Sequence, residues 1–316
     1  MHDVTTPVSG LTAAEPALVN AELDRLVQLA WEPGWAPQAM RQLIALCATL
    51  RQQTELWPVA RALMRAHPIH RLMCEDPLVL HATAPGVSRP RYLDLVLGHP
   101  DAAPLSQGAS RAGRELSGIN RALPLFNTLR NRTAYLASMV DALAEMQPGA
   151  EVLTLRAGHL REAAGVTKLR HVGRWMVLEP DNATRAVLYR GLPAGLSVQT
   201  MRGSLRGFGR RPFRRGCFDL VCLPRMPDCP LAEQQELLDA AFSVLKPGGR
   251  LLVCTSGRPV PEDAWIETFL DARIRWMGRR ELEALLSVIP AADCASRSVF
   301  PSLDGHQLHA ILRRRG

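Results

Sequence analysis

The sequence contains almost no lysine and no long uninterrupted apolar run. Lys168 and Lys246 are its only lysines, so arginine carries nearly all of the positive charge. No stretch approaches the roughly 18 consecutive apolar residues that a membrane-spanning helix needs. Residues 1–19 lack a basic segment followed by an apolar block, which is the pattern of a secretion signal. We therefore expect a cytoplasmic protein with no membrane partner.

Cysteine patterns typical of disulfide frameworks and zinc sites are also missing. The seven cysteines are odd in number, scattered and mostly embedded in apolar stretches, which indicates reduced thiols. Cys217, Cys222 and Cys229 form the only cluster, but no pair of them has the two-residue spacing of a zinc knuckle. We expect no metal site.

The net charge of +8 raises the question of a nucleic-acid partner. Much of this charge lies in RGSLRGFGRRPFRRG (202–216) and in the C-terminal RRRG. The first segment is a basic loop with two phenylalanines, which could meet RNA or an anionic ligand. A solvated basic surface explains the same residues, because arginine replaces lysine throughout the chain, as coding bias would produce. We therefore expect a small-molecule substrate rather than a nucleic acid.

The first half of the chain has the pattern of an all-helical domain. Residues 15–66 carry apolar positions at helical spacing, interrupted by WEPGWAP (31–37), and residues 67–98 are broken by prolines into short helices. A third amphipathic segment (119–146) ends at the turn QPGA. We predict a helical N-terminal domain over residues 1–146 and a second domain over 147–316.

The second half alternates strands with helices. Such alternation implies right-handed crossovers and a mostly parallel sheet covered on both faces. Two further strand-like runs near the C-terminus flank the turn residues DG (304–305) and predict an antiparallel edge. The predicted strands are 151–155, 174–179, 196–201, 218–223, 250–255, 296–303 and 307–314, and the predicted helices are 183–189, 231–245 and 279–289.

The loop after the first strand, LRAGHLRE (155–162), occupies the place where open α/β sheets bind ligands. Gly158 would let the backbone approach a ligand closely, and a helix beginning near His159 would point its free amides toward it. An ordinary strand-to-helix turn would explain a single glycine equally well.

Glu179 further supports a nucleotide site, and the KPGG segment marks a turn between two elements. Glu179 closes the second strand, where a carboxylate can accept hydrogen bonds from both hydroxyls of a ribose. Asp181 is better interpreted as the N-cap of the following helix. The segment KPGG (246–249) ends a long helix and turns into the fifth strand, where two glycines supply backbone angles closed to other residues.

Together these motifs resemble the class I methyltransferases that depend on S-adenosylmethionine (SAM). The likeness rests on FDLV (218–221), KPGGRLLV (246–253) and the acidic residue closing the second strand. More narrowly, HPIHRLMCEDP (67–77), VLTLRAGHLREA (152–163) and residues 265–290 resemble a bacterial subgroup with a helical N-terminal region and GHLRE in its glycine loop. The resemblance implies an α/β fold with a Rossmann-like class I methyltransferase sheet, and a role in bacterial small-molecule or signal biosynthesis.

The resemblance also implies roles for residues at matching positions. The loop after the first strand would line the methionine and ribose parts of SAM, Glu179 would hold the ribose hydroxyls, and Pro180 and Ser204 would lie near the adenine. Leu223, Pro224 and Arg225 would face the sulfonium and the reacting group, although Arg225 could instead pair with Asp228, and His159 could merely cap its helix. The cofactor-binding candidates are Arg156, Ala157, Gly158, His159, Glu179, Pro180, Ser204, Leu223 and Pro224.

The acceptor side of the site departs from the subgroup. Residues 84–98 stand where a KPRGY-like segment is expected, and PRMPDCPL (224–231) replaces an aromatic-rich stretch. Catalytic candidates come from FNTLRNRTAY (126–135), which places Asn127, Asn131 and Tyr135 on one helical face; a solvated surface is the alternative. The catalytic candidates are Asn131, Tyr135 and Arg225, and Tyr92 and Arg132 are further candidates for the acceptor pocket.

Three functions remain open. The first is methyl transfer from SAM to a small metabolite. The second is cyclisation of SAM as sole substrate to azetidine-2-carboxylate with release of methylthioadenosine, for which Trp175 or Tyr135 could hold the cation. The third is a non-catalytic SAM-binding protein, which the presence of Glu179 and the KPGG turn disfavours. The sequence leaves open a homodimer, and also whether the helical domain is a lid or a partner-binding surface.

Overall fold

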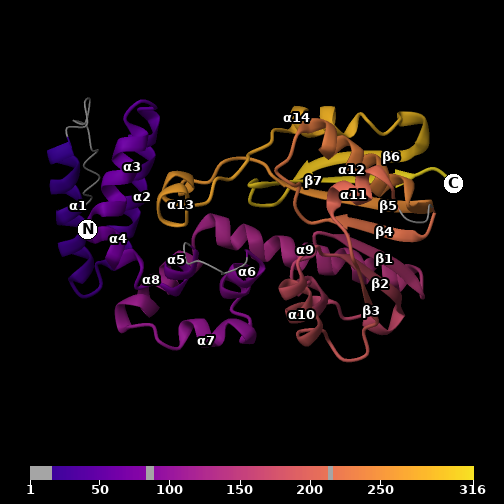
Figure 1. Ribbon diagram of the computed structural model, residues 1–316, viewed down its shortest axis with the longest axis horizontal. Helices are drawn as coiled ribbons and strands as arrows, with labels where there is room; N and C mark the ends of the chain where they lie inside the picture. The colour runs from indigo at the N-terminus through magenta and orange to yellow at the C-terminus, as the bar shows by residue number, and fades with distance from the viewer. Residues whose placement is uncertain (1–15, 83–88, 213–215) are drawn as a thin grey trace. The chain divides into compact units, whose positions relative to one another are not determined.

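The computed structural model describes residues 16–82, 89–212 and 216–316 (Figure 1). The chain forms two compact units, one comprising Met1–Pro85, Ser106–Leu123 and Pro261–Arg273, and the other comprising Gly86–Leu105, Pro124–Val260 and Ile274–Gly316. The domain boundary that the sequence places after residue 146 remains a prediction. Most of residues 1–19, part of 84–98 and part of the basic loop 202–216 lie outside the described residues.

The first unit is helical, as the sequence predicts. Its core is made by apolar residues at helical spacing, among them Leu23, Leu43 and Met64, which are fully buried. Prolines at the first helical turn begin α2 and α3, where their missing N–H costs nothing. The helices of this unit are α1 (Pro16–Trp31), α2 (Ala36–Gln52), α3 (Trp57–Ala66), α4 (Pro68–Met73), α5 (Pro77–Ala82), α8 (Arg111–Arg121) and α13 (Asp263–Phe269).

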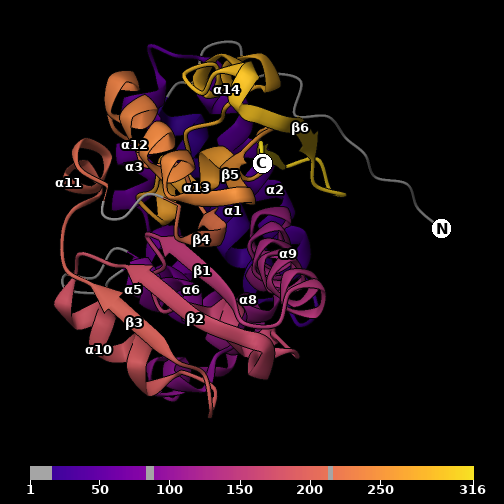
Figure 2. The same cartoon turned by 90° about the vertical axis from the view of Figure 1, so that its right-hand side faces the viewer.

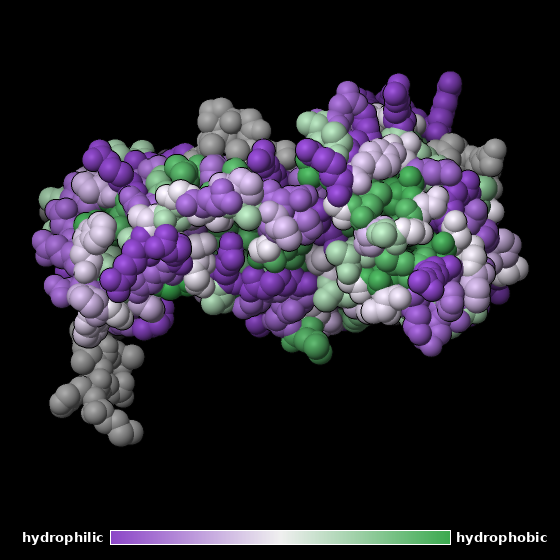
Figure 3. Space-filling model, turned by 90° about the horizontal axis from the view of Figure 1, so that it is seen from below, coloured by the Kyte–Doolittle hydropathy of each residue, from purple (hydrophilic) through white to green (hydrophobic). Residues whose placement is uncertain are grey.

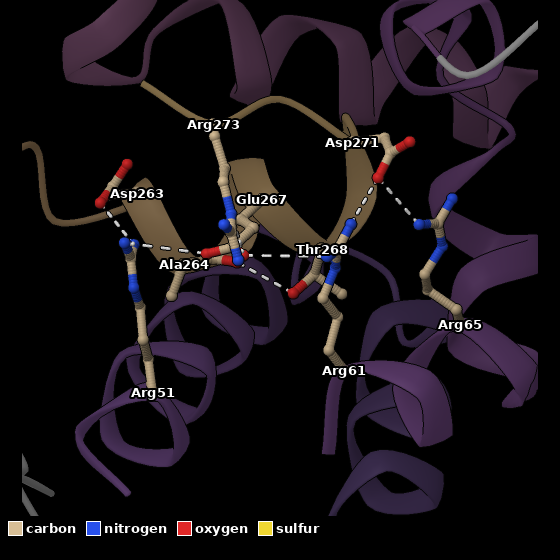
Figure 4. A network of polar contacts seen from close by, with 9 residues as sticks. All are labelled: Arg51, Arg61, Arg65, Asp263, Ala264, Glu267, Thr268, Asp271 and Arg273. Atoms are coloured by element: carbon tan, nitrogen blue, oxygen red, sulfur yellow. Dashed lines mark hydrogen bonds and ion pairs between the residues drawn. The ribbon is translucent and has the colours of Figure 1, made fainter. Parts of the chain in front are cut away.

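Helix α13 belongs to this unit although it lies far from the others in sequence. Arginines of α2 and α3 bind its acidic residues (Figure 4). Arg51 pairs with Asp263, and the buried Glu267 accepts a hydrogen bond from Arg273 at 3.0 Å and lies 3.7 Å from Arg51. Trp265 is fully buried beside them. This ionic network and the apolar core beneath it fix α13 to α2 and α3.

The second unit is built on a seven-stranded sheet in the order β3-β2-β1-β4-β5-β7-β6. The first five strands are parallel, and β7 runs antiparallel between β5 and β6. This is the predicted Rossmann-like class I methyltransferase sheet with an antiparallel C-terminal edge. The strands are β1 (Ala150–Leu155), β2 (Val172–Leu178), β3 (Val198–Met201), β4 (Phe218–Leu223), β5 (Leu245–Ser256), β6 (Cys294–Pro301) and β7 (Gln307–Arg314).

Helices cover both faces of the sheet, and α9 and α12 lie on opposite sides of the strands (Figure 2). Alternate residues of each strand serve the two cores: Leu153 and Val221 pack toward α12, whereas Val152 and Leu220 pack toward α9. The remaining elements of this unit are α6 (Arg89–Leu97), η1 (Pro100–Ala102), α7 (Ala103–Ser106), α9 (Pro124–Met146), η2 (Arg161–Gly165), η3 (Leu169–His171), α10 (Asn182–Arg190), α11 (Leu205–Arg210), α12 (Leu231–Ser243), α14 (Arg279–Leu286) and η4 (Ala291–Asp293).

The KPGG segment lies inside β5 and not before it. Gly248 has a φ of +78°, and a Cβ on Gly249 would lie 2.9 Å from the carbonyl oxygen of Phe218. The register of β4 against β5 shifts at this point, because the glycines form an irregularity in the strand. Lys246 reaches back to the buried Asp219 at 2.7 Å. Packing within the sheet therefore explains this motif.

None of the described helices is long and apolar enough to cross a membrane. On the face of the molecule in Figure 3, hydrophobic side chains form separate patches among hydrophilic ones.

Candidate functional site

The carboxyl ends of the parallel strands meet at one edge of the sheet. Strand order reverses between β1 and β4, which are neighbours although two strands separate them in sequence. In open α/β sheets the crevice at such a switch point is where ligands bind. The loops after β1, β2 and β4 end at this edge, so the predicted cofactor residues of these loops come to one side of the sheet.

The backbone of the loop after β1 is unusual. Arg156, Gly158 and Leu160 all have positive φ, at 58°, 58° and 53°. Such angles are costly for residues other than glycine and persist only where the surroundings hold them. The predicted helix near His159 is therefore wrong: the chain instead makes the short 3₁₀ helix η2 after Leu160.

A buried cluster of charges holds this loop. Asp94 of α6 accepts two hydrogen bonds from Arg161, at 2.6 and 2.8 Å, and lies 2.7 Å from Nδ1 of His159. Arg161 also donates to Asp101 at 2.7 Å. A Cβ on Gly191 would lie 2.1 Å from Nη1 of Arg161, so only glycine fits there. His159 and Arg161 of the GHLRE sequence thus attach the loop to α6.

Glu179 is buried at the carboxyl end of β2 and binds the loop after β1. Its Oε2 accepts a hydrogen bond from the N–H of Gly158 at 2.9 Å, and its Oε1 accepts one from the N–H of Asp181 at 3.3 Å. Pro90 of α6 lies 3.3 Å from where a Cβ of Gly158 would be. Gly158 is therefore required by its positive φ and by its contact with Pro90.

The other predicted cofactor residues differ in their exposure. Leu223 and Pro224, at the end of β4, are buried, whereas Pro180 and Ser204 are exposed. Ser204 caps α11, because its Oγ accepts the N–H of Gly207 at 3.0 Å. Arg156, Ala157 and Arg225 are partly exposed, and the N–H of Arg156 continues the sheet by donating to Leu178 at 2.8 Å. The cofactor roles of all these residues remain predictions.

The predicted catalytic residues of α9 contact the β6–β7 hairpin. Asn131 donates to Asp304 at 3.3 Å, and Thr128 donates to the same oxygen at 2.9 Å. The Tyr135 ring lies 4.5 Å from the His309 ring, between centroids. These contacts give Asn131 and Tyr135 a packing role, and a catalytic role for either remains a prediction.

Trp175 does not hold a ligand cation. It is fully buried in the core of β2, and its Nε1 donates to the hydroxyl of Thr154 at 2.9 Å. The suggestion that Trp175 stacks on a SAM sulfonium is therefore wrong. Alternation within β2 decides this, because the side chain points into the α9 layer.

One polar cluster was not predicted as a unit. Glu162 of η2 is buried, and burial raises its pKa to about 7 even though Arg132 of α9 opposes the shift. Burial also lowers the pKa of Arg132. Cys254 of β5 lies 3.3 Å from His309 of β7; burial raises the pKa of the thiol to about 12 and lowers that of the imidazole to about 4. Both are therefore neutral near pH 7.

No family model matches the chain, and no curated protein matches it in sequence. A solved structure described as a possible exported protein from Bordetella parapertussis is similar at a TM-score of 0.61 and 15% identity, over 96% of this chain and 100% of that chain.

Two solved methyltransferases show more distant similarity. Magnesium protoporphyrin IX methyltransferase from Synechocystis PCC 6803, with bound SAH, is 12% identical at a TM-score of 0.43, over 60% of this chain and 87% of that chain. The N-methyltransferase NodS from Bradyrhizobium japonicum is 14% identical at a TM-score of 0.39, over 61% of this chain and 98% of that chain. At such identities similarity concerns the fold alone.

Proposed function

We propose that this protein is a SAM-dependent enzyme of bacterial small-molecule metabolism that transfers the methyl group of SAM to a small metabolite. The observation that carries the proposal is the position of Glu179. Its buried carboxylate closes β2 and contacts the loop after β1 through the N–H of Gly158. This arrangement lies at the edge of the sheet where the strand order reverses, which is the ligand-binding edge of such sheets.

The residues present fit the adenosine part of SAM. Each oxygen of the Glu179 carboxylate accepts one backbone N–H. A carboxylate has about four acceptor positions, so capacity remains for the two ribose hydroxyls. The buried Leu223 and Pro224 at the end of β4 are apolar and would keep water from the sulfonium.

SAM supplies a methyl carbon made electrophilic by its sulfonium, so the protein mainly has to orient the reactants and exclude water. Glu179 would bind the ribose, and the loop after β1 would position the ligand. The attachment of that loop to α6 through Asp94 fixes its geometry before a ligand arrives.

Replacing Glu179 with Gln is expected to weaken binding of SAM and of S-adenosylhomocysteine about 10- to 100-fold, because a hydrogen bond to a charged group is worth about 1.5–3 kcal/mol. Gln can still accept the N–H of Gly158, so the loop should keep its shape. Isothermal titration calorimetry with both nucleosides measures the change. Asp181→Asn is the matched control, since Asn also caps a helix, and it should bind both as the wild type does. Equal affinities for E179Q and D181N would contradict the ribose assignment.

Mass spectrometry after incubation with SAM identifies the reaction. Methyl transfer predicts that SAM alone stays intact, and that adding the correct acceptor releases S-adenosylhomocysteine. Methylthioadenosine together with azetidine-2-carboxylate, formed without an acceptor, would establish cyclisation of SAM instead. Bound SAM that no small-molecule acceptor converts would favour a non-catalytic SAM-binding protein.

A further inference from the structure

The unpredicted polar cluster lies at the ligand-binding edge of the sheet. Cys222 is in register with Thr154 of β1, one residue before each of these strands ends. Cys254 is in register with His309 near the end of β5. Cys222 and Cys254 belong to the core layer that faces α9. The cluster therefore sits where the carboxyl ends of β1, β4 and β5 meet, on the α9 side.

Glu162 and Arg132 are the members of this cluster that can carry opposite charges near pH 7. Helix η2 packs closely on α9, since a Cβ on Gly165 would lie 3.1 Å from that of Ala137. This places Glu162 of η2 within the electrostatic field of Arg132 of α9. Across the described residues, no ion pair within 4.0 Å joins the two side chains. The two side chains therefore interact electrostatically without forming an ion pair.

Both side chains have buried polar atoms without a partner. Oε1 of Glu162 and Nε of Arg132 make no hydrogen bond within the part of the chain that the structure describes. Leaving such atoms unpaired in the interior is costly, so they are candidates for contact with a bound ligand. The neighbouring Cys222, Cys254 and His309 bring no charge near pH 7.

The charges select one class of ligand. Arg132 would repel a metal ion, and Glu162 would repel a phosphate or another simple anion. A group carrying both charges satisfies both side chains: a carboxylate matches the fork of a guanidinium, and an ammonium donates to a carboxylate. The α-amino acid end of SAM is such a zwitterion. His159, for which the resemblance implies a place beside the methionine part of SAM, binds Asp94 through Nδ1.

We propose that Arg132 binds the α-carboxylate, and Glu162 the α-ammonium, of the amino-acid end of SAM. This inference rests on the proposed function and adds residues for which no role in SAM binding was predicted. In this proposal the protein recognises the amino-acid end of SAM as well as its adenosine.

Calorimetric titration with three probes tests each contact separately. SAM carries both charged groups, decarboxylated SAM lacks the carboxylate, and methylthioadenosine lacks the whole amino-acid end. Arg132→Gln should weaken the binding of SAM about 10- to 100-fold and leave the affinities for the other two probes unchanged. Glu162→Gln should weaken the binding of SAM and of decarboxylated SAM by a similar factor and leave the affinity for methylthioadenosine unchanged. Arg132→Lys keeps the charge but not the forked guanidinium. Its affinity for SAM should lie between those of the wild type and R132Q.

Equal losses for all three probes would overturn the inference, because they would show a structural role, and so would unchanged affinity for SAM in both variants. Wild-type protein that binds methylthioadenosine as tightly as SAM would also overturn it while leaving the adenosine site intact. Wild-type protein that binds none of the three probes would overturn the proposed function itself. If R132Q does not fold, E162Q, which is nearly isosteric with the wild type, decides the outcome.

Discussion

Replacing Asp94 with Ala is expected to lower the free energy of unfolding by about 3–5 kcal/mol, the usual cost of removing one partner of a buried ion pair. Asp94 is 1% exposed and accepts hydrogen bonds from Arg161 at 2.6 and 2.8 Å. Without it, the buried guanidinium keeps only Asp101, and the buried His159 loses its partner as well. Denaturation in urea followed by tryptophan fluorescence measures the change.

Asp101→Ala is the matched control, because Asp101 binds the same arginine but its side chain is 39% exposed. Its loss should cost no more than about 1 kcal/mol. Burial acts to raise the pKa of Asp94, but the hydrogen bonds from Arg161 and His159 outweigh it and hold that pKa below its usual value. The stabilisation is thus present above the unfolded pKa of 3.8 and is lost as the pH falls below it. D94A no less stable than D101A would contradict the role given to this cluster.

Replacing Glu162 with Gln is expected to stabilise the ligand-free protein by about 3 kcal/mol at pH 8 and by almost nothing at pH 4. Burial raises the pKa of Glu162 from 4.5 to about 7 in the folded state. The folded protein therefore holds this proton more tightly than the unfolded chain does. The contribution of Glu162 to the free energy of unfolding falls as the pH rises from 4.5 to about 7. A difference of about 2.5 pKa units corresponds to about 3 kcal/mol. Gln does not ionise, so the variant avoids this loss.

The titratable groups near Glu162 do not reverse the direction of this pH dependence. Arg132 favours the ionised carboxylate, but the raised pKa already includes its effect, and Cys222 and Cys254 stay neutral over this range. Glu145→Gln is the control, since that carboxylate on α9 is 70% exposed, and it should not change the pH profile. Denaturation curves between pH 4 and 8 provide the comparison. A stability difference between E162Q and wild type that does not change with pH would contradict the burial of an ionisable carboxylate here.

A gain in stability together with weaker SAM binding would identify Glu162 as a residue kept for binding at the expense of stability. Such trade-offs are common where a site needs an unpaired buried charge.

The periodicity of the sequence was enough to predict the sheet. Strands 218–223 and 307–314 were predicted with the bounds that the structure has, because apolar runs between turn residues leave few alternatives. The helix predicted near His159 failed for a reason that no local pattern contains. His159 and Arg161 bind Asp94, which lies 65 and 67 residues earlier in the chain. Leu160, which lies between these two residues, has a left-handed conformation, so no α-helix begins there.

The candidate site was also only partly predictable, because tertiary contacts decide part of it. Glu179 could be singled out as a candidate, because a single acidic residue closing a strand is visible in the sequence, and its role in binding SAM remains a prediction. The zwitterion site proposed for Arg132 and Glu162 could not be predicted, since its two side chains come from different elements and come near each other only when η2 packs on α9. Helix α13 was missed as well, because arginines about 200 residues away hold it in place.

A crystal structure of the protein with S-adenosylhomocysteine tests the central claim most directly. We predict the ribose hydroxyls within hydrogen-bonding distance of the Glu179 carboxylate and the amino-acid end on the α9 side, beside Arg132 and Glu162. Nucleoside bound away from the carboxyl ends of β1 and β2, or no nucleoside at saturating concentration, would contradict the account.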